Sequence, residues 1–126
     1  MIVLTEKALS LQHLYGYTCR GRHARKYMKT EGKIIKQAYI ESIKKQYKGK
    51  LIKKGFVGLE IFYFFGTKHR RDIDNYSKAL LDAFSGIIYR DDEQVKPLIQ
   101  DKFYDKKNPR IEIRFIKSYK VTYLKQ

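Results

Sequence analysis

Apolar residues along the chain change from a short run to helical spacing and then to an aromatic run. Residues 2–4 are an apolar, strand-like run. From Thr30, which is a favoured helix N-cap residue, apolar side chains recur near helical spacing until the pattern fades near Gly49. Aromatic and β-branched residues then fill residues 56–65, which predicts a strand that is buried on both faces.

The second half of the chain predicts one more helix and two more strands. The helix covers about residues 75–84, with Asp74 as its N-cap and Gly86 as its terminator. The first strand runs over about residues 95–104. The second covers residues 110–116, where apolar and charged residues alternate.

The order of these elements indicates the class of fold. Residues 106–109 contain turn-forming residues and a proline, so we expect them to form a hairpin loop between the last two strands. The resulting order, β-α-β-α-β-β, predicts an α+β fold with a mixed β-sheet and two helices packed on it. We find no repeat or linker, and we expect a single domain over residues 1–126.

Charge adds an expected partner to this picture. The chain has 126 residues, with 28 Lys and Arg against 13 Asp and Glu, which gives a formal net charge of +15. Such a charge repels itself in the folded state and is more useful for binding a polyanion. Nucleic acid is the favoured partner, because basic side chains displace counterions from phosphates, and a membrane surface is the weaker alternative.

The segment from residue 10 to residue 29 contains basic residues and no acidic one. Its tyrosines, Tyr15, Tyr17 and Tyr27, either stack on unpaired bases or pack beneath the segment. A solvated charged loop is the alternative for each basic residue taken alone. The candidates for phosphate contacts in this segment are Arg20, Arg22, Arg25, Lys26 and Lys29.

Two features of the sequence bear on the cellular compartment. The single Cys19 excludes a disulfide within the chain. The start of the chain is too charged for a signal peptide, and no apolar run reaches the length that crosses a membrane. We therefore expect a cytoplasmic protein with no membrane partner.

The acidic residues concentrate in one part of this basic chain. Asp72 and Asp74 are two positions apart, so their side chains face one ion if the segment is extended. The turn at Asp91 and Asp92 is expected to supply a third carboxylate. Carboxylate oxygens suit Mg²⁺, which places a Lewis acid on a phosphate. Six of the thirteen acidic residues lie here: Asp72, Asp74, Asp82, Asp91, Asp92 and Glu93.

Basic residues border the acidic cluster. Lys78 lies one helical turn after Asp74 and is placed either to stabilise charge on the phosphate or to pair with Asp82. Arg70 and Arg71 precede the cluster, where they are expected to hold flanking phosphates. Simpler roles remain open at this point: Asp74 as a cap, Asp72 as an ion-pair partner of an arginine, and Asp91–Asp92 as a polar turn.

Residues 72–86 read DIDNYSKALLDAFSG, and residues 89–95 read YRDDEQV. This order resembles the RusA family of Holliday junction resolvases, whose pattern is Asp-x-Asp-Asn-x-x-Lys, an Ala-Leu-Asp-Ala-Leu-like helix, and then Asp-Asp-x-Gln. Arg20-Gly21-Arg22 and residues 30–33, TEGK, resemble the basic loop and the first-helix start of that family. The resemblance extends over most of the chain.

The resemblance implies a homodimer that binds branched DNA, the four-way junction of recombination and repair, and nicks two opposed strands with Mg²⁺, which Mn²⁺ can replace. By position it implies Asp72, Asp74 and Asp92 as catalytic metal ligands and Lys78 as a catalytic lysine, on the base side or for charge stabilisation. Asn75 would hold the site or contact the DNA. The spacing alone leaves an exchange of roles between Asp91 and Asp92 open.

The sequence departs from the family in one place and leaves two other classes of function open. Family members commonly carry Pro-Pro-Ser-x-Asn after the first strand, whereas residues 9–13 here read LSLQH. Gln12 or His13 replaces that asparagine, or its contribution is absent. The alternatives to a nuclease are a non-catalytic basic nucleic-acid-binding module and an accessory protein that binds RNA. The intact acidic set favours the nuclease.

Overall fold

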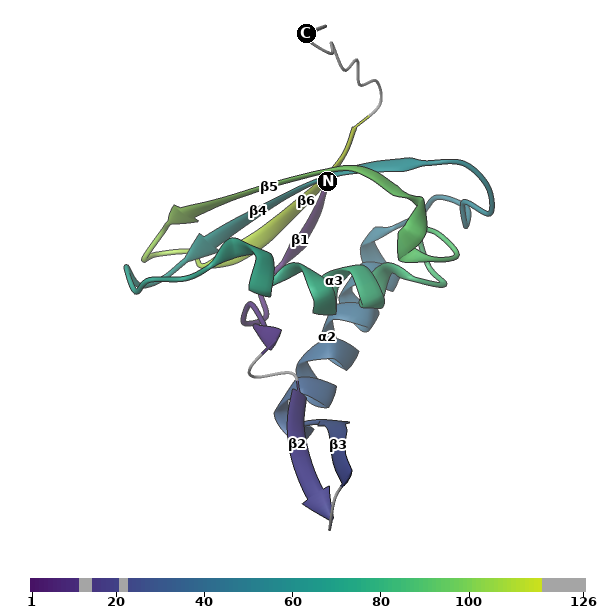
Figure 1. The fold of residues 1–126 in the computed structure, drawn as a ribbon. Helices are drawn as coiled ribbons and strands as arrows, with labels where there is room; N and C mark the ends of the chain where they lie inside the picture. The colour runs from purple at the N-terminus through teal and green to yellow at the C-terminus, as the bar shows by residue number, and fades with distance from the viewer. Residues whose placement is uncertain (12–14, 21–22, 117–126) are drawn as a thin grey trace, which may run out of the picture.

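A four-stranded mixed sheet carries two helices on one face in the computed structural model, which describes residues 1–11, 15–20 and 23–116 (Figure 1). The strand order is β1-β6-β4-β5. The central pair is β4 (Val57–Phe65) and β6 (Arg110–Ile116), which run antiparallel. The edges are β1 (Ile2–Leu4), antiparallel to β6, and β5 (Val95–Tyr104), parallel to β4. The α+β prediction is confirmed, and the predicted element order is confirmed apart from an additional ribbon between β1 and α2.

The side chains of β4 alternate between the two faces of the sheet. Leu59, Ile61 and Tyr63 are fully buried beneath the helices. Phe62 and Phe64 point to the other face and are half-buried. The prediction of a strand buried on both faces is therefore wrong, because the helices cover one face of the sheet and leave the other to solvent.

Helix α2 (Thr30–Gln46) begins where the sequence indicates, but Thr30 does not cap it. Lys29 occupies the N-cap position, and no side chain makes a capping hydrogen bond there. Tyr39 and Ile43 are fully buried and fix α2 to the sheet, and the Tyr39 hydroxyl donates to the carbonyl of Lys7. None of the helices in the described part of the chain is long and apolar enough to cross a membrane.

The last two strands have the predicted bounds but not the predicted pairing. β5 and β6 both pair with β4, which lies between them. Residues 106–109 therefore connect two strands across the end of β4, and the prediction of a hairpin loop is wrong. A turn-forming composition indicates a change of direction, but it does not specify which strands become neighbours.

A two-stranded ribbon, β2 (Tyr15–Arg20) and β3 (His23–Met28), projects away from the sheet beyond the first turn of α2 (Figure 1). These strands were not predicted, because residues 10–29 as a whole show no clean apolar period. Residues 24–27 are all exposed. Gly16 lies opposite Tyr27, whose ring would collide with any side chain at that position.

Candidate active site

Asp72 and Asp74 lie at a short 3₁₀ turn, η1 (Ile73–Asn75), that follows β4. Both are exposed, and Asp72 has extended backbone angles. Asp72 is the N-cap residue of η1, and Asp74 is the second residue of the turn. The segment is thus extended at Asp72 and turns at Asp74, and the expectation that both carboxylates face one ion stays a prediction. The two residues remain neighbours on one exposed turn.

Helix α3 (Ser77–Phe84) begins after this turn, two residues later than predicted. Tyr76 occupies its N-cap position without a side-chain hydrogen bond, so the prediction of Asp74 as the cap is wrong. Leu80 and Phe84 are fully buried and hold the helix against the core. Gly86 has a φ of +85°, a left-handed conformation that favours glycine, which confirms it as the terminator.

Lys78 joins α3 to a second acidic turn. Its Nζ lies 3.1 Å from Oδ1 of Asp82, one helical turn further on, which confirms that predicted pair. The same Nζ lies 3.8 Å from Oδ2 of Asp92 in the turn η2 (Asp92–Gln94). One exposed ammonium group is thus within ion-pair distance of two carboxylates from different elements.

Asp91 and Asp92 have different surroundings in this turn. The carboxylate of Asp91 accepts a hydrogen bond from the backbone N–H of Glu93 and caps η2. Asp92 faces Lys78 instead. Because one carboxylate oxygen of Asp91 already accepts a backbone hydrogen bond, this arrangement favours Asp92 over Asp91 as a metal ligand.

Gln94 fixes the acidic turn to the rest of the protein, a role that the sequence analysis missed. Its Oε1 accepts from the backbone N–H groups of Arg90 and Asp91, at 2.8 and 3.2 Å. Its Nε2 donates to the carbonyls of Ile52 and Gly55, at 3.0 and 3.1 Å. One amide side chain therefore ties Asp91–Asp92 to the loop before β4. The signal in the sequence was the last residue of the Asp-Asp-x-Gln pattern.

We expect Gln94→Ala to lower the free energy of unfolding by about 2 kcal/mol, because four backbone groups lose a hydrogen-bond partner and water replaces the amide only in part. Urea denaturation measures this change. Gln37→Ala is the matched control, since Gln37 is exposed on α2 and makes one long hydrogen bond of 3.5 Å to Glu41. Equal stability of the two variants would contradict the anchoring role of Gln94.

When one of the two is protonated, the carboxyl groups of Asp91 and Asp92 share a hydrogen bond. This contact lowers the pKa of Asp91, and the Glu93 N–H lowers it further. The same contact raises the pKa of Asp92, to which desolvation adds. As the pH falls, Asp92 is therefore protonated before Asp91, and the charge that faces Lys78 is the first of the two to be lost.

Asp91→Asn is expected to lower the pKa of Asp92 toward the ordinary aspartate value, because it removes the carboxylate that accepts a hydrogen bond from protonated Asp92 and, with it, the neighbouring negative charge. Asparagine keeps an oxygen for the Glu93 N–H, so the turn should persist. An NMR titration of the Asp92 carboxyl carbon measures the shift. Glu93→Gln, which changes an exposed carboxylate next to the pair, serves as the control and should move the midpoint less. An unchanged or higher Asp92 midpoint in Asp91→Asn would contradict the coupling.

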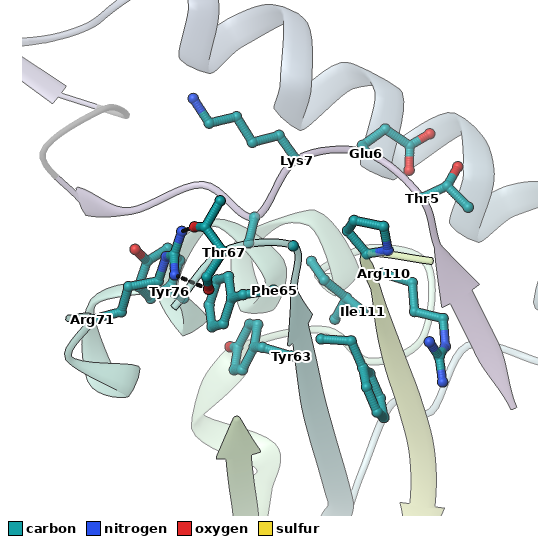
Figure 2. A pocket seen from close by; sticks show the side chains of 14 residues that line it. Thr5, Glu6, Lys7, Tyr63, Phe65, Thr67, Arg71, Tyr76, Arg110 and Ile111 are labelled. Atoms are coloured by element: carbon teal, nitrogen blue, oxygen red, sulfur yellow. Dashed lines mark hydrogen bonds between the residues drawn. The ribbon is translucent and has the colours of Figure 1, made fainter. Parts of the chain in front are cut away.

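Arg71 stiffens the loop before η1. Its guanidinium donates to the carbonyl and to the hydroxyl of Thr67 (Figure 2). It also donates to the carbonyl of His69 and stacks over the Phe65 ring at 4.3 Å. The ammonium of Lys102 on β5 donates to the carbonyl of Arg71 itself. These contacts hold the chain immediately before Asp72.

The other predicted DNA contacts lie in three places. Arg70 is exposed beside Arg71, and Asn75 is half-buried in η1, where its backbone N–H donates to the Asp72 carbonyl. Arg25 and Lys26 are exposed on β3, at the ribbon. Arg20 ends β2, whereas Arg22, Gln12 and His13 lie outside the described residues.

The acidic residues have the ligand atoms that Mg²⁺ prefers, but they do not form a preassembled metal site. Among the described residues, no three His, Cys, Asp or Glu side chains are gathered closely enough to hold a metal ion. The available donors at η1 and η2 are carboxylate oxygens, which are the ligands that Mg²⁺ prefers. Mg²⁺ usually takes one or two protein carboxylates and completes its shell with water and substrate phosphates. The donor set therefore fits this ion without a three-residue cluster in the free protein.

Carboxylates at the turns before and after α3, in a strongly basic chain, are the features of a protein that acts on nucleic acid phosphates. The family model described as endodeoxyribonuclease RusA matches residues 10–116. The chain belongs to this family of endodeoxyribonucleases. A 42-residue stretch is also 48% identical to the uncharacterized protein YqaN of Bacillus subtilis (strain 168). That similarity covers 33% of this chain and 29% of YqaN.

Proposed function

We propose that this chain is a structure-selective endodeoxyribonuclease that resolves four-way DNA junctions by paired, Mg²⁺-dependent nicks in opposed strands. The observation that carries this proposal is the position of the Lys78 ammonium within ion-pair distance of both Asp82 and Asp92. Lys78 lies in the first turn of α3, the helix that directly follows Asp72 and Asp74. A protein that only binds DNA has no use for exposed carboxylates on a phosphate-binding surface, because they repel the ligand.

In this proposal Asp72, Asp74 and Asp92 hold Mg²⁺. The bound ion would supply a Lewis acid at the scissile phosphate and lower the pKa of an attacking water. The Lys78 ammonium would stabilise negative charge on the phosphate as the bond breaks. Asp82 orients that ammonium through the 3.1 Å contact, so it acts as a positioning residue.

The projecting ribbon is the main DNA-binding element in this proposal. Arg25 and Lys26 are exposed on it, and Arg20 is the last residue of β2. A two-stranded ribbon is narrow enough for the major groove of duplex DNA. A ribbon of this kind is also marginally stable by itself, so contact with a phosphate backbone would stabilise it. Arg70 would add a contact next to the cut, and Asn75 would support the η1 turn.

Two copies of the chain would act together on one junction. Resolution requires symmetric cuts in two strands, and a twofold homodimer presents two identical sites. Sedimentation of the purified protein with and without a junction tests this part of the proposal. A complex with a single copy per junction would contradict it.

Selectivity for branched DNA distinguishes this function from general nuclease activity. Four strands that form a junction are compared with linear duplexes of the same arm sequences, at equal protein and Mg²⁺ concentrations. We expect cuts at the branch point and little cutting of the duplexes. Equal cutting of both substrates would reduce the proposal to a non-selective endodeoxyribonuclease, and binding to RNA in preference to either would overturn it.

A further inference from the structure

A cavity of about 360 Å³ lies beside the η1 turn (Figure 2). It is open to solvent on one side and is lined by the end of β4, by the residues that follow β1 and by the residues at and just before the start of β6, including Phe65, Thr5 and Pro109. This volume lies within the range of sites that bind small molecules, which is about 300–1,000 Å³. The cavity is thus large enough for one planar ring system of nucleotide size.

One wall of this cavity is aromatic. The ring of Tyr76 lies 5.3 Å from that of Phe65 and 5.9 Å from that of Tyr63, between ring centroids. Tyr63 is fully buried and supports the other two rings, which are half-buried. The guanidinium of Arg71 lies over Phe65 on the same side (Figure 2). Aromatic rings and arginine planes are the groups on which unstacked bases lie.

The chain connects this cavity directly to the acidic turn. Arg71 and Tyr76 both line the cavity, and the residues between them include Asp72 and Asp74. A nucleotide whose base enters the cavity therefore has its phosphates at the η1 turn. We propose that the cavity takes one unstacked nucleobase of the DNA substrate, next to the phosphate that is cut. This inference rests on the proposed function.

A four-way junction makes such a base available at low cost. Extruding a base from a regular duplex costs stacking and pairing energy, whereas bases in disrupted or single-stranded regions are extruded more easily. When the four arms of a junction are not stacked end to end, the base pairs at the branch point lack a stacking neighbour on one side. The cavity would then contribute to selectivity for branched DNA, because extruding a base from an intact duplex costs more free energy.

An abasic scan tests the proposal on the unmodified protein. Single nucleotides around the branch of a four-way junction are replaced in turn by abasic sites, and binding is measured with metal chelated so that no cutting occurs. We expect one position on each cut strand, adjacent to the cut phosphate, where removal of the base weakens binding by about 5- to 100-fold. A uniform profile would overturn the proposal.

Phe65→Leu tests whether the lost contact is in this cavity, because leucine keeps apolar volume but removes the ring. We expect the variant to bind the intact junction more weakly and to show no further loss with the sensitive abasic junction. Phe56→Leu is the matched control, since Phe56 is 70% exposed near the opposite end of β4, and it should keep the full abasic profile. If Phe65→Leu does not fold, Tyr76→Leu takes its place.

The outcomes separate this inference from the proposed function. A protein that binds and cuts the junction but has a uniform abasic profile retains the proposed function and loses the base site. An abasic effect that persists unchanged in both cavity variants places the base elsewhere and also overturns the inference. A protein that binds no junction overturns both.

Discussion

Asp74→Asn is expected to reduce junction cutting by roughly a thousandfold or more while junction binding persists or tightens. The loss follows because a proposed ligand of the ion changes from a charged oxygen to a neutral one, and charge stabilisation by a bound metal is worth several kcal/mol. Binding should persist because asparagine has nearly the same shape, and removal of a negative charge reduces repulsion toward phosphate. Gel-shift titration in chelator and single-turnover cutting in Mg²⁺ measure the two quantities.

Asp101→Asn is the matched control for this variant. Asp101 is exposed on β5, on the face of the sheet that carries no helix, and the substitution removes the same charge. We expect its binding and cutting to equal those of the unmodified chain. If Asp74→Asn loses binding and cutting together, Asp74 supports the fold of the η1 turn rather than the chemistry.

Replacing Arg25 and Lys26 by alanine is expected to weaken junction binding by roughly 60-fold at about 0.1 M salt. Each of the two side chains is taken to neutralise one phosphate, and each such contact contributes a slope of about 0.9 to the fall of log affinity with log salt concentration. The same variant should therefore lower the salt dependence of binding by about 1.8 in that slope. Affinities measured over a range of salt concentrations test both values.

A second pair of basic residues distinguishes the ribbon from the overall charge. Lys44 and Lys45 are exposed in the last turn of α2, at the opposite end of that helix from the ribbon. Replacing both by alanine removes the same net charge. We expect a much smaller change in affinity and slope. Equal losses in the two double variants would mean that the net charge, and not the ribbon, governs binding.

The sequence predicted those parts of the fold that depend on neighbouring residues. The bounds of β5 and β6 were correct, and a helix ending at Gly86 was correct, because these follow from side-chain alternation and from glycine's conformational freedom. The position of β4 between β5 and β6 was not predicted, since pairing is set by contacts distant in sequence. The ribbon was missed because its residues 24–27 are exposed and give no apolar period.

The candidate site follows the same division. The pair of Lys78 and Asp82 was predicted because it is one helical turn long. The 3₁₀ turn that contains Asp74 was not predicted, because the spacing of the acidic residues does not reveal it. The role of Gln94 was missed because its partners Ile52 and Gly55 lie 42 and 39 residues away along the chain.

The most direct test of the account is strand cutting of a synthetic four-way junction with each strand labelled in turn, in Mg²⁺ and in chelator. We expect nicks at matching positions in two opposed strands when Mg²⁺ is present and none when it is chelated. The nicked products should be substrates for DNA ligase. Binding of the junction without cutting, across Mg²⁺, Mn²⁺ and other divalent ions, would contradict it.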